Sequence, residues 1–266
     1  MDKIKVAVNG AFGRMGREVS LAVLEDKGLE LTGAFDLNGQ GKDMGEVLGK
    51  GALGVIVQEF SSQTLLESKA QVVVDFTVPS AVMGNIELAL DCGVYPVVGT
   101  TGISQDDLKI IAGWVEKAGV SIMIAPNFAL GAVLMMRFAS IAARFLNQAE
   151  IIELHHDQKV DAPSGTSIKT AEMISANRRQ EPSPREELIK IPGTRGGTAE
   201  NVHIHSVRLQ GLLAHQEVIF GGLGETLTIR HDSYDRKSFM PGIVMAVKKI
   251  QELRGVVYGL ENILDL

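Results

Sequence analysis

The chain has 266 residues, of which 45% are hydrophobic and 22% are charged, as is typical of a globular protein rather than a disordered or fibrous one. A formal net charge of −6 leaves no basic footprint for nucleic acid, and no apolar run is long enough to span a bilayer, so neither kind of partner is expected. An N-terminus without an apolar signal region and a single cysteine, Cys92, favour a cytoplasmic enzyme without an intrachain disulfide.

Residues 1–126 alternate short β-branched runs with helical patterns. The strand-like KIKVAVNG is followed by the helical GREVSLAVLED, and the alternation continues through LELTGAFD, VVVDFTV, YPVVGTTG and SIMIAPN. This order predicts an α/β domain of the Rossmann type, with a doubly wound parallel sheet.

Three glycines at the end of the first strand indicate a dinucleotide site. Gly10, Gly13 and Gly16 open a helix, in a setting where the backbone can approach a pyrophosphate and the helix dipole stabilises it. Phe12 occupies the place of the middle glycine of the usual G-x-G-x-x-G pattern, so a purely structural turn is an equal alternative from this motif alone.

Asp36 supports the dinucleotide interpretation. It ends the second strand, roughly 20 residues after Gly16, where a carboxylate accepts hydrogen bonds from the adenine ribose hydroxyls and repels a 2′-phosphate. No arginine follows Asp36 directly, so NADH is expected to serve at least as well as NADPH. Arg14 and Lys42 keep NADPH open as an alternative.

Two further turns follow later strands of the same domain. Residues 99–102 (GTTG) follow the YPVV strand, and residues 125–128 (APNF) follow SIMI. Because ligands of such sheets bind outside the carboxyl ends of the strands, both turns are expected to line the nicotinamide end of the site.

Residues 127–238 have a different texture and predict a second domain. A long apolar helix begins at Phe128, a strand covers Ile151 to Leu154, and the strand-like runs NVHIHSVRL, AHQEVIF and ETLTIRH are separated by turns. This pattern predicts an α+β domain with an antiparallel or mixed sheet. Residues from about 239 to 266 carry one helix and are expected to complete the first domain.

The segment from Glu150 to Ile174 is the most informative part of the chain. His155, His156 and Lys159 arrive at the end of a buried strand, and an amphipathic helix then starts at Gly165 and Thr166. A histidine can deliver a proton to a substrate as hydride arrives, a lysine can donate a proton or steady a carboxylate, and a helix N-terminus holds an anion. The alternative is a pair of surface histidines beside a loop.

Other polar residues give weaker signals. Asp157 and Asp161 could join the two histidines around a metal, but the interposed lysine and the lack of a helical H-x-x-x-H register argue against zinc, so no metal is expected. His203 and His205 share one face of a strand and could line the substrate pocket or be solvated. Arg195 lies in a glycine-rich loop, where it is either a ligand-binding cation or a solvated one.

Several motifs together make the chain resemble one family, the dihydrodipicolinate reductases. The resemblance spans essentially the whole chain and rests on VNGAFGRMGRE, VDFTVPSA, VVGTTG, APNFALG and, most specifically, ELHHDQKVDAPSGTS. Departures occur in NVHIH at Asn201–His205 and AHQE at Ala214–Glu217, where the family commonly has G-x-I-G-x-H and G-E-H-E. These departures put details of the substrate loop and of the subunit interface in doubt.

The resemblance implies roles for individual residues. It implies that His155 is the acid/base residue, that Lys159 is the proton donor, and that His156, Gly165 and Thr166 bind substrate. The cofactor segments of the family fall on Gly10, Ala11, Phe12, Gly13, Arg14, Met15, Asp36, Gly99, Thr100, Thr101, Ala125, Pro126, Asn127 and Phe128. The second domain would then bind substrate and form a homotetramer.

The implied reaction is the reduction of 4-hydroxy-tetrahydrodipicolinate, a small dicarboxylate, by NADH or NADPH with loss of water, in diaminopimelate and lysine biosynthesis. Two alternatives stay open from the residues: another Rossmann reductase of a small carboxylate, and a non-catalytic NADH-sensing protein. A sensor has no need for the HHDQK cluster, and a semialdehyde dehydrogenase should carry a catalytic cysteine, for which Cys92 has no fitting context.

Overall fold

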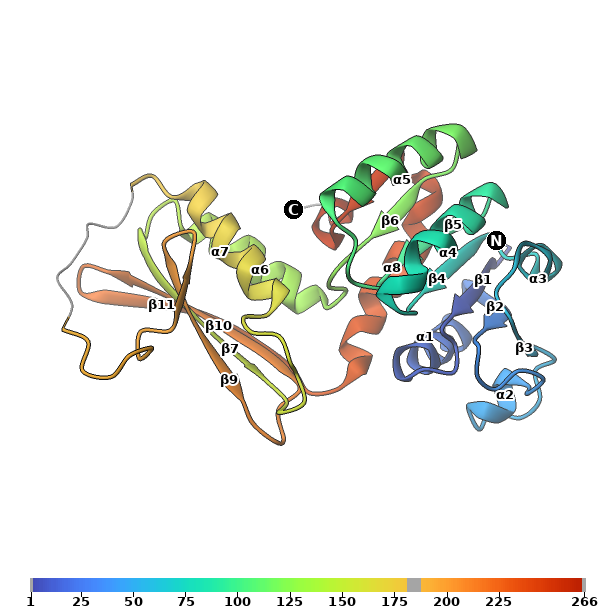
Figure 1. The fold of residues 1–266 in the computed structure, drawn as a ribbon, viewed down its shortest axis with the longest axis horizontal. Helices are drawn as coiled ribbons and strands as arrows, with labels where there is room; N and C mark the ends of the chain where they lie inside the picture. The colour runs from blue at the N-terminus through green and yellow to red at the C-terminus, as the bar shows by residue number, and fades with distance from the viewer. Residues whose placement is uncertain (1, 181–187, 265–266) are drawn as a thin grey trace. The chain divides into compact units, whose positions relative to one another are not determined.

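The computed structural model describes residues 2–180 and 188–264 and shows two compact units (Figure 1). The first unit comprises residues 1–128 and 239–266, and the second comprises residues 129–238. None of the helices in the described ranges has the length and apolar character that a bilayer crossing requires.

The first unit is built on a seven-stranded sheet in which every pair is parallel. The strand order is β12-β6-β5-β4-β1-β2-β3, so the direction of winding reverses between β1 and β4. Such a reversal opens a crevice at the carboxyl ends of the two strands. The strands are β1 (Ile4–Asn9), β2 (Leu29–Phe35), β3 (Val57–Gln58), β4 (Val72–Asp75), β5 (Tyr95–Val98), β6 (Ile122–Ile124) and β12 (Val256–Tyr258).

Helices cover both faces of this sheet because right-handed crossovers that run in opposite directions from the reversal place their helices on opposite sides. Helices α4 and α5 pack against one another, and α1 packs against α8. The helices are α1 (Arg14–Glu25), α2 (Met44–Val47), α3 (Ser62–Ser68), α4 (Pro79–Asp91), α5 (Gln105–Ala118) and α8 (Met240–Lys249), with short 3-10 segments η2 (Ile250–Glu252) and η3 (Leu260–Ile263).

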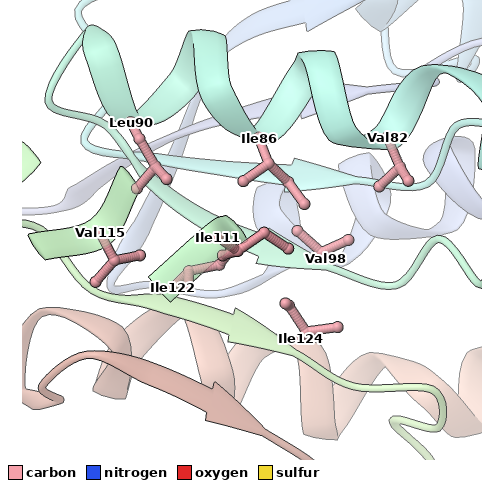
Figure 2. Close-up of a cluster of buried hydrophobic side chains, with 8 residues drawn as sticks. All are labelled: Val82, Ile86, Leu90, Val98, Ile111, Val115, Ile122 and Ile124. Atoms are coloured by element: carbon pink, nitrogen blue, oxygen red, sulfur yellow. The ribbon is translucent and has the colours of Figure 1, made fainter. Parts of the chain in front are cut away.

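An aliphatic cluster joins α4 and α5 to the sheet (Figure 2). Val82, Ile86 and Leu90 recur every four residues on α4, so they share one helix face, and they point toward β5 and β6. Ile111 and Val115 supply the corresponding face of α5. Aliphatic residues at this spacing give each helix one apolar face that packs on the sheet.

The second unit has a five-stranded sheet in the order β11-β10-β7-β9-β8, packed against two helices. Strands β7 and β9 pair in parallel, and the other pairs are antiparallel. The elements are α6 (Leu130–Ala142), β7 (Gln148–His155), α7 (Gly165–Asn177), β8 (Gly197–Ala199), β9 (Val202–Arg208), β10 (Ala214–Gly222), β11 (Glu225–Ser233) and the 3-10 segment η1 (Arg236–Phe239).

The fold class is therefore the predicted one, a Rossmann-type α/β domain with a second α+β domain. The second sheet is mixed, which is one of the two sheet types predicted. The reason is that α7 lies between β7 and β9 in the chain, and a helical crossover returns the chain in the same direction.

Candidate active site

The turn after β1 is shaped to receive a phosphate. Gly10 has a φ of +78°, and a Cβ there would lie 2.5 Å from the carbonyl oxygen of Phe76. A Cβ on Gly16 would overlap the carbonyl oxygen of Gly10, so α1 packs directly on the turn. Helix α1 begins after Gly13, no side chain of the described residues caps it, and its first turn contains no acidic residue. Its N-terminal N–H groups are thus suited to an anion.

Asp36 is tied to this turn. The backbone N–H of Phe12 donates to Asp36 Oδ2 (2.9 Å), and the backbone N–H of Asn38 donates to Oδ1 (2.8 Å). Each carboxylate oxygen can accept further hydrogen bonds, so the group stays competent to hold ribose hydroxyls.

Two cationic side chains lie over the ring of Phe12, the residue whose backbone N–H donates to Asp36. The guanidinium carbon of Arg17 lies 4.5 Å from the centre of the Phe12 ring, and Lys42 Nζ lies 5.4 Å from it. Sequence reasoning identified Lys42 and missed Arg17, although Arg17 stands one helical turn after Arg14.

The carboxyl ends of β4 and β5 lie side by side, with β4 next to β1. A Cβ on Gly99 would overlap the ring of Phe76, and the rings of Phe76 and Phe128 lie 6.0 Å apart. Phe128 and Ala125 are buried, whereas Pro126 between them is exposed. Phe76 was not predicted as a site residue, and its place directly after a strand of four buried residues was the available signal.

In the second unit, His155 ends β7 with its ring bound to a carboxylate. His155 Nδ1 and Glu153 Oε2 form a hydrogen bond, and the Glu153 side chain has no exposed surface. Burial raises the pKa of Glu153, but the hydrogen bonds from His155 and Arg208 outweigh it and lower that pKa to about 2. An ionised carboxylate only accepts, so Nδ1 carries the proton and Nε2 is left to exchange one with a ligand.

Arg208 connects this pair to the loop that carries Lys159. Its two terminal nitrogens donate to Glu153 Oε1 (2.8 Å) and Oε2 (2.9 Å), and one of them also donates to the carbonyl oxygen of Asp161 (2.7 Å). The carboxylate of Asp161 in turn accepts two hydrogen bonds of 2.7 Å from Lys159 Nζ, which hold the pKa of Asp161 below its usual range. His155 and Lys159 thus belong to one bonded group.

The start of α7 is anchored beside the same group. Ser164 caps the helix by accepting from the Ser167 N–H, and the Ser167 hydroxyl donates to Gln216 Oε1 (2.9 Å). Gln216 lies directly across the sheet from Glu153. A Cβ on Gly165 would meet no atom within 4 Å, so there is open space where the helix begins.

His156, His203 and His205 do not share the position of His155. His156 follows β7 and is partly exposed. The register pairs His155 with Arg208 and Ile152 with His205, so His203 and His205 project from the opposite sheet face. They therefore lie on the other face from His155, and His205 is hydrogen-bonded to Glu150, as in the alternative of a hydrogen-bonded strand histidine.

Arg195 also lies at that opposite face. It donates to Glu150 (2.5 Å and 3.3 Å), and His205 Nε2 lies 2.9 Å from the same carboxylate. Arg195 is thus paired with a carboxylate of its own chain, and its side chain remains 39% exposed.

Glu153 and Arg208 are site residues that sequence reasoning did not assign. Glu153 had a local signal, since it is an acidic residue among the aliphatic residues Ile151, Ile152 and Leu154 of a strand. Arg208 had none, because its partner lies 55 residues earlier in the chain.

Comparison with known proteins matches both parts of the chain to one family. The family model for the N-terminus of dihydrodipicolinate reductase matches residues 4–128, and the model for its C-terminus matches residues 131–264. The 4-hydroxy-tetrahydrodipicolinate reductase of Moorella thermoacetica is 51% identical over 264 residues, covering 98% of both chains. That of Listeria welshimeri is 49% identical, covering 98% of this chain and all of the relative.

A solved structure gives the same result in three dimensions. Dihydrodipicolinate reductase from Paenisporosarcina sp. TG-14, with dipicolinate bound, superposes with a TM-score of 0.86 and 41% identity over 98% of this chain and 100% of that chain. An amine dehydrogenase from Mycobacterium smegmatis, at 13% identity and a TM-score of 0.70 over 97% and 95% of the two chains, shares the fold alone. With both family models matched along nearly its whole length, the chain belongs to the dihydrodipicolinate reductase family.

Proposed function

We propose that the protein reduces 4-hydroxy-tetrahydrodipicolinate to tetrahydrodipicolinate with NADH or NADPH, with loss of water, as a step of diaminopimelate and lysine biosynthesis. The observation that carries this proposal is the bonded group of His155, Glu153, Arg208 and Lys159 beside the start of α7. It combines a proton donor, cations and a helix N-terminus, which suit a ring with two carboxylates. The Paenisporosarcina relative holds such a ring, dipicolinate.

The residues of the first unit fit a dinucleotide. Gly10 and Gly16 let the turn pack directly against β4 and α1, and the N-terminus of α1 can hold the pyrophosphate. When bound, the nicotinamide cofactor supplies the hydride. The residues proposed to hold it are Gly10, Ala11, Phe12, Gly13, Arg14, Met15, Asp36, Gly99, Thr100, Thr101, Ala125, Pro126, Asn127 and Phe128.

The residues of the second unit would orient the substrate and move its proton. His156 and the positive end of α7 at Gly165 and Thr166 bind the carboxylates. Lys159 gives up its hydrogen bonds to Asp161 and binds the substrate in their place. It then delivers a proton where charge develops on the ring. His155 acts through Nε2, with its tautomer held by Glu153.

The test is turnover of NADH and of NADPH, with the unstable substrate made in situ from pyruvate and aspartate semialdehyde by dihydrodipicolinate synthase. We expect substrate-dependent oxidation of both cofactors, with NADH at least as good because Asp36 disfavours a 2′-phosphate. Cofactor binding without turnover would instead favour a non-catalytic NADH sensor or a different carboxylate substrate.

Substitutions assign the roles. Lys159→Ala and His155→Ala should each lower kcat by about 10²-fold or more, the usual contribution of general acid–base catalysis, and leave NADH affinity unchanged. Lys169→Ala is the matched control, because Lys169 pairs only with exposed Glu172 on α7 among the described contacts. A loss of NADH affinity in the first two variants would contradict the assignment.

The family resemblance also leads us to propose a cytoplasmic homotetramer that assembles through the second sheet. The sheet face opposite His155 supports this, because it carries the partly exposed aliphatic side chains Ile152, Leu154, Val207 and Ile219.

A further inference from the structure

A buried carboxylate, Asp75, stands at the point where the winding of the first sheet reverses. Its residue is 3% exposed, and it ends β4 directly across from Asn9, which ends β1. Oδ2 accepts from Asn9 Nδ2 and Asn85 Nδ2, both at 2.9 Å. Oδ1 accepts from the Thr77 N–H (3.1 Å), the Thr77 hydroxyl (2.8 Å) and the Thr100 hydroxyl (2.6 Å).

None of these five donors, all within the described residues, is a cation. Burying a carboxylate without a cationic partner costs free energy even when it is fully hydrogen-bonded. The parallel pairing of β4 with β1 and β5 uses backbone groups alone, and Val72, Val73 and Val74 supply the apolar contacts of the strand. Sheet formation therefore does not explain why a carboxylate stands here.

The two loops beside Asp75 are held in different ways. The turn after β1 is fixed by backbone hydrogen bonds. The N–H groups of Gly10 and Ala11 donate to the carbonyl of Phe35 at the end of β2, and that of Gly13 donates to the carbonyl of Gly10. Within the described residues, the backbone N–H groups of residues 100–103 donate to no other backbone group. That loop is tied to β4 by the Gly99 N–H, which donates to the Asp75 carbonyl, and by the Thr100 hydroxyl on the Asp75 carboxylate.

Thr100 and Thr77 form a closed arrangement with the carboxylate. The Thr100 hydroxyl donates to Asp75 Oδ1, so its lone pairs accept the Thr77 N–H (2.8 Å). Thr77 follows Phe76, whose ring fills the space that a Cβ on Gly99 would need. A change at Asp75 thus reaches the 99–102 loop through two hydroxyls and a backbone N–H, whereas its side chain reaches the turn after β1 only through the Asn9 amide.

We propose that Asp75 is a positioning residue that sets the 99–102 loop at the nicotinamide end of the cofactor site. The inference rests on the proposed cofactor site, since it assigns that loop to the nicotinamide half of the dinucleotide. It predicts an effect confined to that half. The adenine half is held by Asp36 and the glycine turn, whose backbone N–H groups donate to Phe35, Asp36 and Gly10 rather than to Asp75.

The decisive variant is Asp75→Asn, which keeps the size of the side chain. An amide places an NH₂ group against either the two asparagine donors or the threonine donors, so one set loses its acceptor. We expect the Kd for NADH, measured by calorimetric titration, to rise at least about tenfold. The Kd for ADP-ribose, which lacks the nicotinamide, should change less than about twofold. Equal weakening of both ligands, or no weakening of NADH, overturns the inference.

Two further variants guard against a general loss of structure. Asn85→Ala removes one donor from α4, outside both cofactor loops, and should shift the ratio of the two Kd values in the same direction by about threefold. Ser121→Ala is the control, because it removes a buried hydroxyl that donates to the Ile250 carbonyl (2.8 Å) elsewhere in the unit, and it should leave the ratio unchanged.

These outcomes separate the inference from the proposed function. If Asp75→Asn does not fold, an unchanged ratio in Asn85→Ala overturns the inference. If the wild-type protein turns over substrate while the ratio stays constant in every variant, the inference alone fails. If the wild-type protein binds NADH but does not turn over, the proposed function fails, and the ratio still decides the role of Asp75.

Discussion

Glu153 shows how much a single buried side chain controls. Its pKa of about 2 lies below the ordinary 4.5 because hydrogen bonds from His155 and Arg208 outweigh the effect of burial. A lowered carboxyl pKa contributes stability that is present above pH 4.5 and is lost as pH falls through 2, about 3 kcal/mol in all. Glu153→Gln should therefore flatten the acid limb of the unfolding free energy, measured by denaturant titration at several pH values.

The same variant should affect catalysis, since a neutral amide in place of the Glu153 carboxylate could not stabilise a protonated His155. We expect kcat to fall on the order of 10²-fold with NADH affinity unchanged. Glu150→Gln is the matched control, because Glu150 lies on the same strand but on the opposite face. Wild-type turnover in Glu153→Gln would show that His155 does not need its partner.

At the scale of the element, the close packing of α1 on the turn after β1 decides cofactor binding. Gly16→Ala adds a Cβ that would overlap the Gly10 carbonyl, so the helix start must shift, at a cost of about 1–3 kcal/mol. We expect a lower Tm and weaker NADH binding, measured by scanning calorimetry and titration. In contrast, Gly113→Ala in α5 meets no atom within 4 Å and should raise stability by about 0.5–1 kcal/mol. Equal effects of the two variants would contradict the packing argument.

At the scale of the whole molecule, the proposed tetramer depends on the aliphatic side chains on the sheet face opposite His155. Light scattering should give a mass of about four times the 28.6 kDa of one chain. Ile219→Glu should lower that mass, because it places a charge beside Glu150 on the face that carries Ile152 and Leu154. A wild-type monomer would contradict this assembly, whereas a lower mass for Gln63→Glu on exposed α3 would show that added charge acts nonspecifically.

Local sequence patterns were enough to predict the architecture of the first unit. They were also enough to identify the polar HHDQK segment of the second unit. Strand and helix periodicities are properties of short segments, so their alternation predicted a parallel sheet. The glycines after β1 and the HHDQK segment carry their chemistry within a few residues of one another. For that reason a cofactor turn and a catalytic role for His155 and Lys159 could be predicted without knowing any long-range contact.

What the sequence could not decide depends on which segments meet. Arg208 reaches Glu153 across 55 residues, and Thr100 reaches Asp75 across 25, so neither pair leaves a local signal. The side on which His203 and His205 project follows from strand register, and a shift of one residue reverses it. The tertiary structure alone decided these points, because register and burial are set by the packing of the whole sheet rather than by the residues of one strand.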